Sequence, residues 1–188
     1  MTNKDDYIVQ PRLTKRMYDT IEEKVVELYE KFHISKFPID PFFIATQLKI
    51  KLIPYSKVNK EKRDCFYENG WLGFNFRNNK KGTIDIYYDD SDSVERQRFT
   101  VMHELGHIIL DHKEDSDLAE ICANYFASYA LAPSPIVVKY FCYDYKSISE
   151  KFFVSHECAC NILRRSSNWE KIPGKLKHYE MKLEELFV

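Results

Sequence analysis

Apolar residues recur every three or four positions over residues 17–32, and this period predicts an amphipathic helix. Asp40 followed by Pro41 is a typical pair of N-cap and first helical residue, so a second, shorter helix is predicted to run towards Leu48. The second half of the chain continues with helical patterns. The further helices they predict cover residues 94–112, 117–131, a short segment from Ser134, two helices joined near 153–155, and a last one within 175–186.

Three short segments have the β-branched and aromatic content of strands. Residues 50–53 alternate loosely and stop at Pro54, residues 65–76 gather aromatic side chains around two glycines, and residues 83–88 read Thr-Ile-Asp-Ile-Tyr-Tyr. These segments precede the main run of helices rather than alternate with it. We therefore predict an α+β fold with a small, mostly antiparallel sheet packed on helices.

Composition narrows the class of protein. The 188 residues include 28 basic and 29 acidic side chains, for a net charge of −1, which argues against a basic nucleic-acid coat or a polybasic membrane anchor. We expect one compact domain over residues 1–188, made of an N-terminal helix (1–35), a central part (36–132) and a helical C-terminal part (133–188). Five cysteines without a CxxC pair, no apolar leader and no uninterrupted apolar stretch of membrane-spanning length predict a cytoplasmic protein with reduced thiols.

The sharpest chemical signal is the segment His103-Glu104-Leu105-Gly106-His107. Residues four apart lie on one face of a helix, so the two histidines can share one metal ion. Glu104 is displaced by about 100° around the helix axis, which places it beside a metal-bound water whose proton it can accept. The alternative is that the two histidines and the glutamate merely lie on a solvated helical face.

Two features favour a site over that alternative. Val101, Leu105 and Ile108 give the helix a buried stripe. Gly106 costs about 1 kcal/mol relative to alanine inside a helix. We therefore expect another part of the chain to approach the helix backbone closely at Gly106.

A hydrolytic zinc site needs a third protein ligand and an open fourth position. A third histidine further along the same segment is rejected, because His112 would lie about 140° from His107 on a continuing helix. Glu120, on the next predicted helix, is the best candidate, and Asp117 and Asp111 are the alternatives.

The residues around Glu120 support this choice. Ala119, Ala123 and Ala127 form a ridge of small residues that lets two helices approach closely. Asn124, four residues after Glu120 on the same face, is placed to hydrogen-bond a metal ligand. A ligand set of two nitrogen atoms and one oxygen atom can bind several divalent ions. We predict a Zn2+ cofactor, with Mn2+ as the alternative.

The stretch RQRFTVMHELGHIILDH, followed by AEICANYFASYALAP, resembles the ImmA/IrrE family of metallopeptidases, and weaker similarity extends over residues 14–165. The resemblance implies a compact zincin-like domain of the gluzincin type, with His103, His107 and Glu120 as zinc ligands and Glu104 as catalytic base. Many relatives carry a second carboxylate at the position of Cys122. Its absence here leaves Glu120 as the less ambiguous ligand.

The resemblance also implies an activity and a partner. Several family members are encoded beside a helix-turn-helix repressor that they cleave or inactivate. We therefore expect a zinc-dependent endopeptidase that acts on such a repressor and binds neither membrane nor nucleic acid directly. The strand predicted at 83–88 immediately precedes the metal-binding helix, and we expect it to be the sheet edge onto which an extended substrate adds. Spacing identifies no donor for the developing oxyanion.

A second class of function comes from residues 147–165, which resemble a helix-turn-helix. This segment would make the protein a non-catalytic regulator that binds DNA or a repressor. Residues 144–165 hold four basic and three acidic side chains, and a net charge of +1 is small for a surface that grips phosphates. We expect the segment to pack against the catalytic part or to contact a protein partner.

Overall fold

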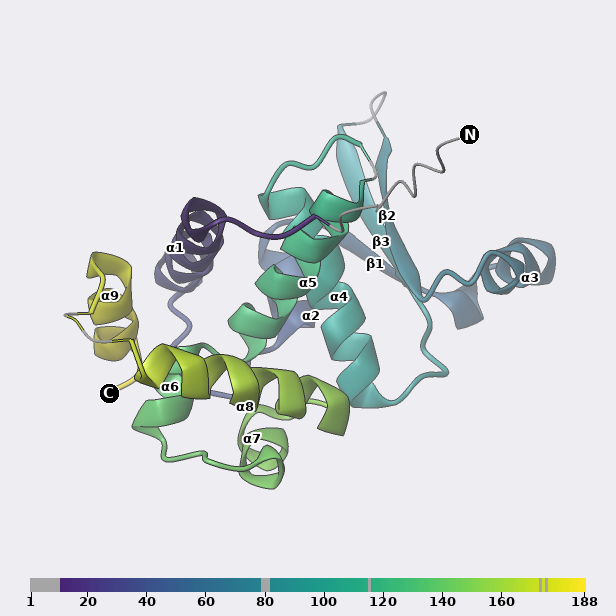
Figure 1. Ribbon diagram of the computed structural model, residues 1–188. Helices are drawn as coiled ribbons and strands as arrows, with labels where there is room; N and C mark the ends of the chain where they lie inside the picture. The colour runs from purple at the N-terminus through teal and green to yellow at the C-terminus, as the bar shows by residue number, and fades with distance from the viewer. Residues whose placement is uncertain (1–10, 79–81, 115, 173, 175) are drawn as a thin grey trace, which may run out of the picture.

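The computed structural model describes residues 11–78, 82–114, 116–172, 174 and 176–188. The chain has the α+β fold that the sequence predicts (Figure 1). In chain order its elements are α1 (Lys15–Phe32), α2 (Pro41–Gln47), β1 (Lys51–Pro54), the 3-10 turn η1 (Tyr55–Lys57), α3 (Lys60–Glu68), β2 (Gly73–Asn78), β3 (Thr83–Tyr88), α4 (Val94–Ile109), α5 (Asp117–Leu131), α6 (Ser134–Lys139), α7 (Tyr145–Phe152), α8 (His156–Glu170) and α9 (His178–Leu186).

Local capping signals account for the helix starts. Oδ1 of Asp40 accepts a hydrogen bond from the backbone N–H of Phe42 at 2.9 Å, with Pro41 in the first turn of α2. Ser93 caps α4 and Ser116 caps α5 through the same kind of side-chain contact. Each cap satisfies a backbone N–H that has no partner within the helix. The starts of α2, α4 and α5 therefore agree with those predicted from the sequence.

The sheet is mixed rather than mostly antiparallel. Its strand order is β1–β3–β2, with β1 parallel to β3 and β2 antiparallel to β3. The expectation that residues 83–88 form a free sheet edge is wrong, because β3 is the central strand and pairs with a neighbour on each side. The parallel pairing arises because the chain leaving β1 passes through α3 and β2 before it returns as β3.

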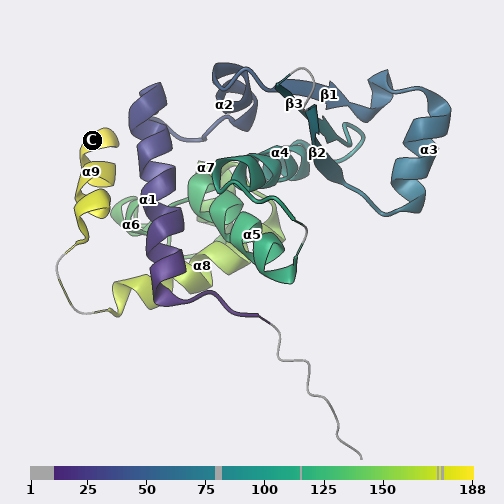
Figure 2. The ribbon, with the colours of Figure 1, turned by 90° about the horizontal axis from the view of Figure 1, so that it is seen from above.

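Residues 65–76, which their aromatic content predicts as strand, are divided between a helix and a strand. Oδ1 of Asn59 accepts a hydrogen bond from the N–H of Lys62 at 3.0 Å and caps α3, whereas β2 begins only at Gly73. The aromatic side chains of this segment cluster on one another and on Tyr87 of β3 instead of alternating across a strand. α3 has no buried residue and lies at the opposite end of the molecule from α9 (Figure 1, Figure 2).

β2 runs directly against α4. A Cβ atom built on Gly73 would collide with Cγ2 of Thr100 in α4 and would lie 3.0 Å from the carbonyl oxygen of Tyr87. Only glycine allows the strand to pass this close to the helix. The contact places the rest of β2 beside the middle of α4.

The hydrophobic core is continuous from α1 to α9, with α4 and α5 side by side within it (Figure 1, Figure 2). The segment Asp117–Lys139, which includes α5 and α6, is long and apolar enough to cross a membrane by length and composition, and 72% of its apolar window is buried inside the protein. Burial in the core accounts for this apolar composition. All five cysteines are free thiols.

The helices expected on either side of residues 153–155 are α7 and α8, and two arginines attach them to the rest of the fold. Arg98 of α4 donates hydrogen bonds to the carbonyl oxygens of Phe152 and Phe153, where α7 ends. Arg165 of α8 donates to the carbonyl oxygen of Ala132, where α5 ends. The α7–α8 pair is therefore held against both α4 and α5.

Candidate metal centre

α4 and α5 come into close backbone contact at Gly106. A Cβ atom built on Gly106 would lie 3.0 Å from Cδ1 of Phe126 and 3.3 Å from Cα of Ala123, both in α5. Ala119 and Ala123 are buried. The expectation that another part of the chain approaches the helix backbone at Gly106 is confirmed, and small residues on both helices make this approach possible.

The close packing brings three side chains to one point. Nε2 of His103 and Nε2 of His107 are 3.0 Å apart. Oε2 of Glu120 lies 3.3 Å from Nε2 of His103, and Oε1 lies 3.1 Å from Nε2 of His107. Among the described residues, these three form the one group of His, Cys, Asp and Glu side chains with the spacing to hold a metal ion.

The spacing of these atoms fits a tetrahedral metal ion. Zn2+ is held at about 2.0–2.1 Å by nitrogen, so neighbouring ligand atoms of a tetrahedral site are separated by about 3.3 Å. The two Nε2 atoms are separated by close to that edge length, and so is each of them from one of the two carboxylate oxygens of Glu120. The Glu120 side chain is half-exposed, which leaves the group accessible to water from one side.

Asn124 orients His103. Its Oδ1 lies 3.0 Å from Nδ1 of His103, so Nδ1–H donates to the amide oxygen and Nε2 carries the lone pair that a metal needs. Burial lowers the pKa of His103 from its ordinary value of 6.5, and the opposing effects of Glu120 and Asn124 do not offset it. The neutral imidazole is the form that binds a metal.

His112 also contacts the site, because α4 does not continue to it as predicted. The helix ends three residues earlier and Asp111 is left-handed (φ 58), so the chain turns back and the N–H of His112 donates to the carbonyl oxygen of His107 at 3.0 Å. Nδ1 of His112 then lies 3.0 Å from Nδ1 of His107. Burial and the charge of His107 lower the pKa of His112. Neutral His112 can accept the Nδ1–H of His107, which would present the lone pair of Nε2 of His107 to a metal ion.

Asp111 and Asp117, the alternatives for the third ligand, lie elsewhere, and so does Cys122. Asp111 pairs with Nη1 of Arg77 at 3.2 Å. In the described part of the chain, Asp117 is outside the group around the histidines. Cys122 belongs to the hydrophobic core. Glu120 is therefore the carboxylate that the fold brings to both imidazoles.

Glu104 is buried, with 6% of its surface exposed, and its Oε2 accepts a hydrogen bond from Nδ2 of Asn75 at 2.8 Å. Asn75 lies in β2, so the strand that packs on α4 also orients this carboxylate. Sequence patterns reveal neither Asn75 nor His112 as a site residue. Predicting that α4 ends before residue 112 would have indicated His112 as a site residue. No local pattern connects Asn75 to a glutamate 29 positions away.

The chain is an α+β domain in which an HExxH helix supplies two histidines and the following helix supplies a glutamate. This is the architecture of a metallopeptidase. The family model Peptidase_M78, described as the IrrE N-terminal-like domain, matches residues 48–164, and the chain belongs to this family. Membership confirms the resemblance to the ImmA/IrrE family and the zincin-like fold, and it implies a metal-dependent peptidase. A search of curated proteins finds no match.

Proposed function

We propose that the protein is a zinc-dependent endopeptidase that hydrolyses a peptide bond in one specific protein partner, a helix-turn-helix transcriptional repressor, in the cytoplasm. The observation that carries the proposal is the convergence of His103, His107 and Glu120, whose ligand atoms all lie within 4.8 Å of one another. The repressor as partner rests on the resemblance to the ImmA/IrrE family.

The side chains divide the chemistry among them. The three ligand residues would hold the ion, and a bound Zn2+ supplies Lewis acidity that polarises the scissile carbonyl and acidifies water, a role that Mn2+ can share. Glu104 accepts the proton of the attacking water and returns it to the leaving nitrogen. Asn75 restricts the orientation of the Glu104 carboxylate. Asn124 and His112 restrict the two imidazoles in the same way.

An extended substrate would pair with β2 rather than with β3. Within the described residues, β2 pairs with β3 on one side and with no strand on the other. Asn75, inside β2, contacts Glu104, so the unpaired edge passes beside the proposed catalytic base. Main-chain hydrogen bonds along this edge would bring the scissile bond to the metal group.

The test is cleavage of a purified repressor encoded beside the gene, by the zinc-loaded protein and by its Glu104→Gln variant. Removing the base lowers the cleavage rate by about 10²–10⁴-fold. The zinc content stays unchanged, because Glu104 is outside the ligand group. Glu68→Gln, at an exposed position of α3, is the matched control and retains the wild-type rate.

Two results would contradict the proposal. Equal rates for the wild type and Glu104→Gln would exclude Glu104 as the base. An unchanged cleavage rate after zinc is removed with a chelator, with no increase when zinc is added back, would exclude a metal-dependent reaction.

The alternative function, a non-catalytic DNA-binding regulator, draws on the helix pair α7–α8, which is joined by a tight turn at the left-handed residue Phe153 (φ 53). The low net charge of this segment argues against it. A salt-titrated duplex-binding measurement separates the two functions. Sequence-independent affinity with a steep salt dependence would favour the regulator.

A further inference from the structure

A groove with a volume of about 1090 Å3 lies between α1, α4, α5 and α8. Asn124, which contacts His103, lies in its wall. Leu72, the residue before β2, lies in the wall as well. A peptide paired with the edge of β2 would therefore enter this groove on leaving the metal centre.

The charges along the groove are predominantly basic. Its basic lining residues are Lys15, Arg96, Arg164, Arg165 and Lys177, and its acidic ones are Asp19, Glu22 and Glu157. Lys177 is paired with both Asp19 and Glu22, at 2.7 and 3.2 Å. The remaining four basic side chains are accompanied by one acidic side chain, Glu157.

Three of these four cations are exposed and available to a partner. Arg164 donates to Oδ1 of Asn161 at 3.2 Å, and within the described ranges no carboxylate lies at ion-pair distance from Arg164 or Lys15. Arg96 reaches Asp92 only at 3.8 Å, with 56% of its side chain exposed. The three come from α8, α1 and α4, so they surround the groove rather than form one stripe.

Aromatic surface lies between these charges. The rings of Tyr18 and Tyr125 meet edge to face at a centroid distance of 4.6 Å, and Phe99 and Trp169 also line the groove. Rings and cations together suit a segment that carries both carboxylates and apolar side chains.

One wall of the groove is formed by α8, and the position of this helix favours contact with a peptide over contact with DNA. A DNA-binding helix-turn-helix presents the outer face of its second helix to the bases. Here the outer residues Asn161, Arg164 and Asn168 line the groove beside the metal centre. Arg98 and Arg165 hold the α7–α8 pair against α4 and α5, so this wall is fixed relative to the metal ligands.

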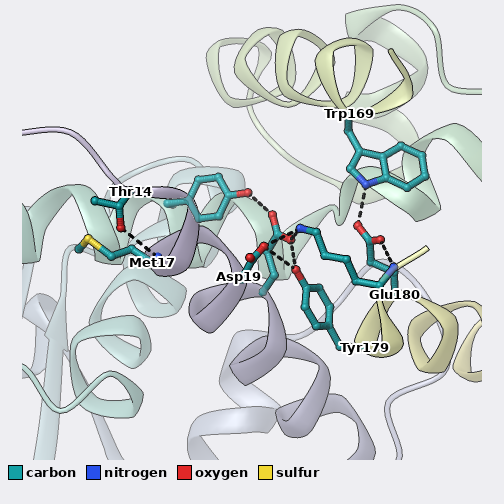
Figure 3. A network of polar contacts seen from close by, with 9 residues as sticks. Thr14, Met17, Asp19, Trp169, Tyr179 and Glu180 are labelled. Carbon is teal, nitrogen blue, oxygen red and sulfur yellow. Dashed lines mark hydrogen bonds and ion pairs between the residues drawn. The ribbon is translucent and has the colours of Figure 1, made fainter. Parts of the chain in front are cut away.

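Side-chain contacts also fix the part of the groove where α1 and α8 meet the start of α9. There Asp19 accepts hydrogen bonds from Lys177 and from the hydroxyl of Tyr179, and Nε1 of Trp169 donates to Glu180 (Figure 3). The groove therefore has a preformed wall in this part as well as along α8. A preformed site loses less conformational entropy on binding than a mobile one.

We infer that this groove is a second binding site for the substrate, which takes an acidic segment of the protein partner that also carries aromatic or aliphatic side chains. Lys15, Arg96 and Arg164 select that segment by charge. The inference rests on the proposed peptidase function and adds the chemistry by which the enzyme recognises its substrate away from the scissile bond.

The test measures binding separately from cleavage. In the Glu104→Gln background, fluorescence anisotropy follows a labelled peptide of alternating glutamate and tyrosine, with a lysine–tyrosine peptide for comparison. The acidic peptide binds, its affinity falls as salt is raised, and the basic peptide does not bind. The double variant Lys15→Glu/Arg164→Glu weakens binding by about tenfold or more at low salt.

The matched control is Lys60→Glu/Lys62→Glu on α3, where both lysines are exposed and lie outside the groove. It changes the net charge by the same amount and leaves the affinity unchanged. Equal losses in the two double variants would overturn the inference, because net charge alone would then explain binding. Binding of duplex DNA in place of the acidic peptide, abolished by the same groove variant, would overturn it as well.

The inference and the proposed function fail in different ways. If the groove variant loses the acidic peptide while the zinc-loaded wild type cleaves no repressor, the groove assignment stands and the peptidase proposal fails. If the wild type cleaves the repressor in a zinc-dependent reaction and Lys15→Glu/Arg164→Glu does so with unchanged KM, the peptidase proposal stands and the groove assignment fails.

Discussion

Two helix contacts in this protein are built from opposite kinds of side chain. Where α4 meets α5, Gly106 lies against Phe126 and Ala123. Where α1 meets α9, Tyr29 and Phe187 pack together as part of the core. Beside them Asp19, Glu22, Lys177 and Tyr179 form a polar cluster, which we call the polar clasp (Figure 3). The first contact holds the proposed metal ligands, and the second attaches the C-terminal helix.

The difference shows how each contact is specified. Small apolar residues set the distance between two backbones, because an added methyl group has nowhere to go. A polar clasp sets orientation through directional hydrogen bonds and depends on the charge of its members. A site that needs ligand atoms about 3 Å apart from two helices requires the first kind of contact. The orientation of a terminal helix can rest on the second, while apolar packing supplies the rest of its attachment.

The largest expected effect comes from filling the α4–α5 contact. Gly106→Val places a branched side chain where even Cβ would lie 3.0 Å from the Phe126 ring. We expect a loss of about 3 kcal/mol in the free energy of unfolding, measured by denaturant titration. Zinc affinity, measured by competition with a chelator, falls with it because Glu120 moves away from the histidines.

A compensating substitution sharpens that result. Phe126→Leu removes the nearest ring atoms but leaves Cα of Ala123, which would lie 3.3 Å from the new Cβ. Adding it to Gly106→Val restores part of the stability but not the zinc affinity. Full recovery of zinc affinity would show that backbone spacing is not what sets the ligand geometry.

The next largest effect concerns the contact between His112 and His107. His112→Ala removes the partner of Nδ1 of His107, and loss of such an orienting group lowers metal affinity by about 10–100-fold. Chelator competition measures this change. Lys113→Ala, at the neighbouring exposed position, is the control and retains wild-type affinity. Unchanged affinity in His112→Ala would remove His112 from the site.

The smallest effect is a pH response confined to the polar clasp. Burial opposes the charge of Asp19, but the hydrogen bond and charge of Lys177 outweigh it and lower the pKa of Asp19 from 3.8. Burial also opposes the charge of Lys177, but Asp19 and Glu22 outweigh it and raise the pKa of Lys177 from 10.5. Asp19 thus contributes stability that is lost as pH falls through its lowered pKa, and Lys177 contributes stability that is lost as pH rises through its raised pKa.

Fluorescence of Trp169 reports on this response, because its Nε1 donates to Glu180 of α9 at 2.6 Å. In a Trp71→Phe background, we expect the signal to be constant at neutral pH and to change below pH 3.8 and above pH 10.5. Lys177→Met reduces the change at both ends. An unaltered profile in that variant would show that the clasp does not hold α9.

Much of the metal centre could be predicted because its signals are local. Helical spacing pairs His103 with His107, and the cost of Gly106 within a helix predicts the close approach of another segment. A ridge of alanines on the following helix then pointed to Glu120. The cap at Asp40 likewise acts within one helical turn. Each of these inferences needs only a few neighbouring residues.

Contacts between distant segments decided the rest. The place of β3 at the centre of the sheet depends on β1 pairing with it across an intervening helix and strand. Asn75 reaches Glu104 only because Gly73 lets β2 pass against α4. His112 reaches His107 because the helix stops and turns at Asp111. Periodicity and capping describe the backbone over one or two turns, whereas strand order and side-chain partners depend on which segments the core brings together.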